Sequence, residues 1–232
     1  MKTTRLNNKK IFLMLIPLLL ILGYNVQNSK AAQVKYTVEG GLRYVDPALS
    51  SVFSIGDKFH LEYIFDSATP DSYPKNPDRG RYNISSLAAT VGVYIATYNG
   101  GGRIEIDNNL VDSFGDYDHY SVNCIQPMIG DSIHGYNLHH QLPIFSLSDV
   151  SAAAFSDDSL VAHELDLSNF QGFLSLSFFN AVVGLYDYLD GVAFVSADIF
   201  SIQMSSVPVP SSFLMFLSGL LSVFGISRIK YL

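Results

Sequence analysis

Four aspartates, Asp107, Asp112, Asp116 and Asp118, lie close together in a polar stretch that ends at His119. Carboxylate oxygens are hard ligands of the kind that Ca²⁺ prefers, and Asp116 and Asp118 fall on one side of an extended chain. The spacing matches neither the EF-hand loop nor the nonapeptide glycine–aspartate repeat. We therefore predict a solvated acidic loop over residues 107–119 without a metal, and a structural Ca²⁺ site is the alternative.

The histidines and the single cysteine are the other residues that could bind a metal or react. No two of them have ligand spacing on a recognisable scaffold, and neighbours such as His139 and His140 point to opposite faces of a strand. We expect no cofactor, with solvated histidines in loops or at strand edges: His119, His134, His139 and His140.

Cys124 is the only cysteine of the chain, so an internal disulfide is excluded. It lies in the strand-like stretch Tyr120–Ile125, where we predict a buried small hydrophobic side chain. Lipidation or an intermolecular disulfide is the alternative.

Three tyrosines, Tyr117, Tyr120 and Tyr136, lie near the aspartates and could stack on sugar rings while the carboxylates bind hydroxyl groups. Aromatic residues of β-proteins are more often found in the core or in cross-strand pairs. A carbohydrate-binding module is therefore an alternative to the primary interpretation.

No recognisable catalytic motif occurs in the chain. There is no Gly-x-Ser-x-Gly elbow and no phosphate-binding loop, and His163-Glu164 lacks a second histidine four residues after His163. A glycosidase needs two carboxylates at a defined separation, which a sequence cannot fix. We predict that the protein is not an enzyme; a secreted hydrolase is the less favoured alternative.

The elements that would carry these residues are strands, because apolar residues alternate with polar ones along most of residues 32–206. Examples are Val34–Val38, Phe59–Phe65, Arg103–Asp107, Leu174–Phe178 and Phe200–Met204. The pattern predicts one antiparallel β-sandwich, jelly-roll-like, in a single all-β domain. The one candidate for a helical turn is Val150–Phe155.

Turn residues separate the predicted strands. The stretch Asp66–Gly80, with three prolines, predicts a long surface loop. Asn99-Gly100-Gly101-Gly102 follows the strand-like Val91–Tyr98, which favours a hairpin with Arg103–Asp107. Asp190-Gly191 before Val192 favours a second hairpin.

The two ends differ from this domain in composition. Residues 1–31 combine a basic start, the 12-residue apolar run Ile11–Leu22 and small residues before a cleavage site. They are typical of a secretory signal peptide that is cut between Ala31 and Ala32. The protein should therefore be exported.

Residues 207–232 hold the uncharged run Phe213–Ile226, which begins after two prolines and is followed by Arg228 and Lys230. As a helix this run would be about 21 Å long against about 30 Å of hydrocarbon, so it spans a membrane only with help from its flanks. The basic end should lie on the cytoplasmic side. A removable sorting signal and a plain C-terminal anchor both fit this pattern.

This tail resembles the PEP-CTERM sorting signal of Gram-negative bacteria, which has a Val-Pro-Glu-Pro-like box, a short transmembrane helix with an internal Gly-Leu, and a basic end. Val209 stands where that signal usually has Glu, and the basic end has two separated charges. The matching positions are Val207, Pro208, Pro210, Gly219, Leu220, Arg228 and Lys230.

The body also resembles small secreted proteins that carry this tail, in Phe53–Phe59, Tyr63–Ser72, Gly80–Tyr82 and Gly191–Ile202. The resemblance implies insertion of a precursor in the inner membrane and processing by an exosortase-type enzyme. It then implies a place at the cell surface or in the extracellular matrix, near exopolysaccharide.

The charge of the body limits its partners. Residues 32–206 contain seven basic and all 21 acidic residues of the chain, which gives them a formal net charge of −14. Binding to nucleic acid requires a surface that neutralises phosphates, so we expect no nucleic-acid partner.

Overall fold

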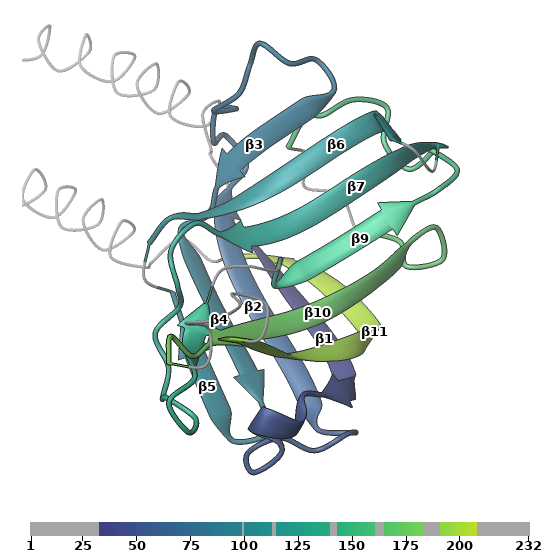
Figure 1. Cartoon of the computed structure of the whole chain (residues 1–232). Coiled ribbons are helices and arrows are strands. Elements are labelled where there is room, and N and C mark those ends of the chain that lie inside the picture. Colours follow the sequence, from purple (N-terminus) through teal and green to yellow (C-terminus); the bar gives the residue numbers. More distant parts are fainter. Residues whose placement is uncertain are drawn as a thin grey trace, which may run out of the picture. The chain divides into compact units, whose positions relative to one another are not determined.

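The computed structural model describes residues 33–98, 100–112, 115–139, 143–160, 165–182 and 191–207 (Figure 1). Nearly all regular structure in these residues is β-strand. The elements are β1 (Gln33–Val45), the 3-10 helix η1 (Pro47–Leu49), β2 (Lys58–Asp66), β3 (Arg79–Asn83), β4 (Ser86–Val91), β5 (Tyr94–Thr97), β6 (Gly102–Asp112), β7 (Gly115–Cys124), β8 (Asn137–His139), β9 (Phe145–Asp149), β10 (Gln171–Phe179) and β11 (Val192–Ser206).

The strands form one curled antiparallel sheet in the order β3-β6-β7-β9-β10-β11-β1-β2-β4-β5, and β8 pairs with β10 outside this path. Figure 1 shows β3, β6, β7, β9 and β10 as one layer and β11, β1, β2, β4 and β5 as a second layer behind it. The prediction of an all-β, sandwich-like antiparallel domain is confirmed.

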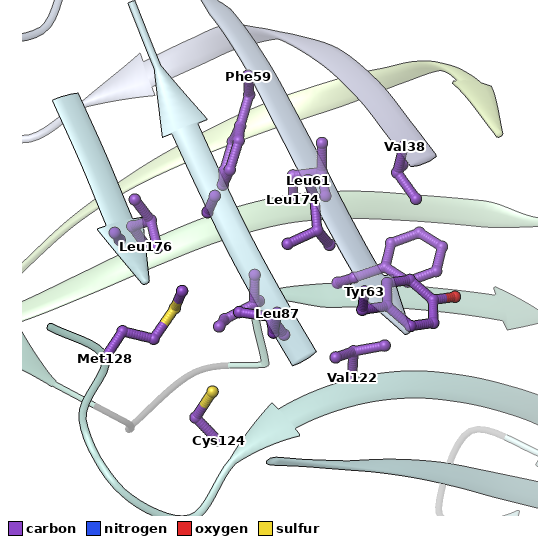
Figure 2. Packing of buried hydrophobic residues seen from close by; sticks show 14 of the residues in the cluster. Val38, Phe59, Leu61, Tyr63, Leu87, Val122, Cys124, Met128, Leu174 and Leu176 are labelled. Carbon is purple, nitrogen blue, oxygen red and sulfur yellow. The ribbon is translucent and has the colours of Figure 1, made fainter. Parts of the chain in front are cut away.

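Alternation along the strands places the core between the two layers. In β2 the residues Phe59, Leu61, Tyr63 and Phe65 are all fully buried, and the residues between them are partly exposed. The hydroxyl of Tyr63 lies 3.0 Å from that of Tyr120 on β7, so side chains of the two layers meet directly. Figure 2 shows this packing around Leu61, Tyr63 and Val122.

The strand order differs from a jelly roll. Most neighbours in the sheet follow one another along the chain, as in a meander, whereas a jelly roll is built from Greek keys. Period-two patterning fixes which face of a strand is buried and carries no information on which strand lies beside it, so this finer prediction was wrong.

The predicted hairpin at residues 99–102 was also wrong. The stretch Val91–Tyr98 is divided by a turn at Gly92, whose φ of 57° suits glycine, and β5 pairs back with β4. β6 pairs with β3 and β7. The glycines after β5 instead belong to a crossing between the layers, where Tyr98 Oη donates to the carbonyl of Ile84 at 3.2 Å.

Residues Val150–Phe155 form a turn in place of the predicted helical turn. The carboxylate of Asp149 accepts hydrogen bonds from the backbone N–H groups of Ser151 (2.8 Å) and Ala153 (3.1 Å). The hydroxyl of Ser151, followed by these backbone groups, holds the pKa of Asp149 below its ordinary value. An aspartate that binds the next backbone donors competes with helix formation.

The first and last strands of the domain are neighbours. β1 and β11 pair from Val34 opposite Ser206 onward, and Val207 N–H donates to the carbonyl of Gln33 at 2.9 Å. The signal-peptide prediction with Ala31 and Ala32, and the tail residues from Pro208 to Lys230, lie outside the described residues. Within the described part of the chain, no helix is long and apolar enough to cross a membrane.

Candidate functional site

The outward-facing side chains of β3, β6, β7 and β9 form a polar surface, which we call the polar face. Their register pairs Arg79 with Asp107 and Arg81 with Glu105. On the other side of β6, Asp107 pairs with His119 and Glu105 with Ser121. Since alternate residues of a strand share a side, these residues line up across the strands. The polar face consists of Arg79, Arg81, Arg103, Glu105, Asp107, His119, Ser121, Asn123 and Ser146.

One hydrogen-bonded network runs across all four strands of this face. Arg79 forms an ion pair with the buried Asp107, whose other oxygen lies 3.4 Å from Nδ1 of His119. Nε2 of His119 lies 3.0 Å from Oγ of Ser146. Burial opposes ionisation of Asp107, but its hydrogen bonds with His119 and Arg79 outweigh that effect, so its pKa lies below the ordinary value.

A second network surrounds Glu105. Its carboxylate lies 3.0 Å from Nε of Arg81 and 2.7 Å from a terminal nitrogen of Arg103, and it accepts a hydrogen bond of 3.3 Å from Asn123. The Nε–H of Arg81 makes no hydrogen bond of good geometry, so charge attraction holds Arg81 beside Glu105. The amide of Asn123 also donates to Ser121 Oγ at 2.8 Å.

Two tyrosines border the polar face. The guanidinium of Arg81 lies 4.8 Å from the ring centroid of Tyr73, a side chain that is 44% exposed. Tyr117 makes an edge contact with His119, with ring centroids 6.4 Å apart. The face therefore combines donors, acceptors and aromatic edges on a single sheet surface.

The acidic stretch 107–119 is a strand pair, so the predicted loop was wrong. Asp107 lies on the polar face, whereas Asp118 points to the core side and is fully buried. The carboxylate of Asp118 accepts backbone N–H groups from Asn109 and Phe155, each at 2.8 Å. Among the described residues no three His, Cys, Asp or Glu side chains are grouped to hold a metal ion.

The three tyrosines do not form the shared platform that the alternative of a carbohydrate-binding module requires. Tyr120 is only 4% exposed, and its hydroxyl meets that of Tyr63 inside the core. Burial raises the pKa of both phenols well above the ordinary value. Tyr136 pairs with Ile133 in a separate loop, so Tyr117 is the one member of the trio that borders the polar face.

The remaining candidates are dispersed. His134 bonds with Ser51 at 2.8 Å, while the carbonyl of His139 accepts a hydrogen bond from Ser177 at 2.9 Å. His140, His163 and Glu164 lie outside the described residues. Cys124 is buried on β7 as predicted, and burial raises the pKa of its thiol to about 11.

Two hollows lie away from the polar face. One of 240 Å³ is lined by Ile106, Tyr120 and the turn after β9. The other, of 520 Å³, lies beside β5 and is bordered by the exposed aliphatic residues Val93, Ile95 and Ile129. Neither hollow brings together a set of ionisable side chains from the sequence-predicted candidates.

Comparison of the chain with protein-family models found no match, and comparisons with curated proteins and with solved structures found none either. The polar face is thus described from its own chemistry. Sequence reasoning missed it because its members come from four strands whose pairing is non-local. The only local signal was alternation, such as Arg79 with Arg81 and Arg103 with Glu105 and Asp107.

Proposed function

We propose that this chain is an exported, non-catalytic protein of the cell surface or extracellular matrix, sorted through its PEP-CTERM-like tail. An exosortase-type enzyme would process the precursor in the inner membrane at residues Val207–Pro210. The mature domain would then associate with exopolysaccharide outside the cell.

The observation that carries this proposal is the pairing of the first and last strands. Gln33 and Val207 are hydrogen-bonded neighbours, so the segments before and after the domain join it at one place. Because both membrane-directed segments of the precursor would leave the domain at the same end, the domain can fold on one side of the membrane while both segments are inserted.

The position of the proposed cut supports the same function. The β1–β11 ladder has its last pair at Val34 and Ser206, one residue before Val207. Cleavage in Pro208–Pro210 would therefore remove the tail without breaking a ladder hydrogen bond. The mature domain would keep every strand that forms its core.

The test is the intact mass of the protein recovered from the envelope and medium of its native host. We expect a chain that starts at Ala32 and ends near Pro210. A variant with Pro208→Ala and Pro210→Ala should retain the tail, because the box is altered. A wild-type mass that still includes Leu232 would contradict processing and would leave a C-terminally anchored domain.

A hydrolase is the second candidate, because Asp107, His119 and Ser146 are connected in the order used by nucleophilic triads. The geometry favours the non-catalytic function. Ser146 is only 5% exposed in the middle of β9, and the contact of 3.4 Å between His119 and Asp107 is long for a hydrogen bond.

A further inference from the structure

We propose that the polar face binds a neutral polysaccharide chain, which lies flat across β3, β6 and β7. This inference deepens the proposed association with exopolysaccharide by naming the surface and the class of sugar polymer. The binding itself depends on the side chains of the face and does not depend on how the tail is processed.

The shape of the face suits an extended polymer. Adjacent strands are spaced about 4.8 Å apart, so the partly exposed polar groups of β3, β6 and β7 extend over roughly 10 Å, whereas Ser146 on β9 is buried. Neither of the two hollows described above opens on this surface. A flat row of groups matches a chain that lies along it better than a small molecule that needs enclosure.

The side chains of the face include both donors and acceptors for hydrogen bonds with sugar hydroxyl groups. Guanidinium groups donate, carboxylates accept, and the amide of Asn123 and the imidazole of His119 can do both. Ion pairs and hydrogen bonds already fix most of these groups, as with Arg103 and Glu105 at 2.7 Å. Prior fixation lowers the entropy lost when a ligand binds.

Charge decides which polysaccharide fits. Arg79, Arg81 and Arg103 are balanced by Glu105 and Asp107, so the face has an excess of one positive charge on a body of −14. A polyanion would have to displace these carboxylates from their arginines while the rest of the body repels it. A neutral polymer does not have to displace the carboxylates, and the acidic body does not repel it.

Tyr73 provides the aromatic contact at the edge of the face. Its ring is 44% exposed and already lies against Arg81, so it presents one apolar edge beside fixed donors. Aromatic side chains contribute contact area with few rotatable bonds, which suits the apolar face of a sugar ring.

The test uses the full-length protein in detergent micelles and measures its retardation in native gels that contain dextran, mixed-linkage β-glucan, galactomannan or alginate. We expect retardation by at least one of the three neutral polymers and none by alginate. Tyr73→Ala should weaken that binding roughly 3- to 10-fold, the range of one aromatic contact. Asn123→Ala should weaken it by a similar factor.

Tyr44→Ala is the matched control, because Tyr44 is 40% exposed and is not a member of the face. It should leave binding unchanged, and circular dichroism should show that all three variants are folded. Absence of binding to every neutral polymer would overturn the inference. Binding to alginate that salt abolishes, or equal loss in Tyr44→Ala and Tyr73→Ala, would overturn it too.

The inference and the proposed sorting fail separately. A retained tail in the mass measurement would remove the sorting proposal and leave the gel result unchanged. Loss of binding would remove the polar face as a ligand site and leave the position of the cleavage unaffected.

Discussion

Asp118 shows what a single buried side chain does for this fold. Its carboxylate accepts two backbone N–H groups, from Asn109 and Phe155, and the φ of Asn109 is 52°. The carboxylate thus stabilises a left-handed residue in the bulge of β6 and fixes the turn after β9 to β7. A residue interpreted from sequence as a solvated acid is a connection between elements.

We expect Asp118→Ala to lower the free energy of unfolding by about 2–4 kcal/mol, because two backbone N–H groups lose their buried acceptor. Urea unfolding followed by circular dichroism measures this change. Asp116→Ala is the control, since Asp116 is exposed on the same strand and should change stability by less than about 0.5 kcal/mol. Equal effects of the two substitutions would contradict the role of Asp118.

The ionisation of Asp107 should make part of the stability depend on pH. Its pKa lies below the ordinary value of 3.8 in the folded protein, so the folded state favours the charged carboxylate. The resulting stabilisation is present above the ordinary pKa and is lost as pH falls through the lowered folded pKa.

Asp107→Asn isolates this effect from that of the other acids. We expect the variant to be less stable than wild type by about 1–3 kcal/mol near pH 7, and the difference to shrink as the pH falls below about 3. Urea unfolding curves of wild type and variant, at pH 7 and below about pH 3, measure this difference in stability. A difference that grows toward low pH would show that the sign is wrong.

Ser146 tests whether the polar face has catalytic chemistry. Its hydroxyl is 3.0 Å from His119 but is enclosed in the centre of β9, so an electrophile in solution has little access to it. We expect a fluorophosphonate probe to leave the native protein unlabelled while it labels a serine hydrolase in the same tube. Labelling that Ser146→Ala abolishes would support the hydrolase in place of the non-catalytic function.

At the scale of elements, β1 and β11 approach each other closely at Gly40. A Cβ on Gly40 would lie 2.3 Å from the backbone carbonyl oxygen of Asp198, at a bulge in this pairing. Only the absence of a side chain allows the two strands to approach at this point. A backbone atom cannot move aside without a shift of the whole strand.

Gly40→Ala should therefore lower the free energy of unfolding by about 1–3 kcal/mol, with strain in the pairing as the cause. Gly41→Ala is the matched control, because its Cβ would meet the ring of Phe200, which is 69% exposed and can rotate away. We expect Gly41→Ala to cost less than half as much. Thermal unfolding ranks the two variants, and the reverse order would contradict this account.

The elements also show where prediction from sequence succeeds. Alternation identified the buried faces of β1, β2 and β10, because burial of one side of a strand is encoded locally. It failed between Asp107 and Asp118, where β6 and β7 carry acids and asparagines that are typical of loops. The buried acceptor role of Asp118 could not be inferred, since its donors come from a bulge and a distant turn.

The sequence also could not predict which strands pair, because strand pairing depends on non-local contacts. The glycines at 100–102 predict a tight turn but contain no information on which strands it joins, and the hairpin inferred from them does not exist. The polar face needs four strands in one register, which depends on packing of the core beneath them. Its residue types were visible in the sequence, and their assembly was not.

At the scale of the whole domain, β11 completes the sheet by pairing with both β1 and β10. A chain that ends at Val207 keeps all of these pairs. The fold should thus be complete before the segment that we propose to be removed. This is the structural condition for a tail that can be cleaved from a folded protein.

A chain that comprises residues 32–207 should therefore melt as one cooperative unit, with slow hydrogen exchange in β1. A chain that ends at Ile199 loses the partners of Val34 through Glu39, from Ser206 to Ser201, and exposes a long apolar edge. We expect this shorter chain to be insoluble or to exchange its β1 amides rapidly. If it instead melted at the same temperature as the longer chain, the β1–β11 pairing would not be what closes the domain, and its ends would be free to separate before any cleavage.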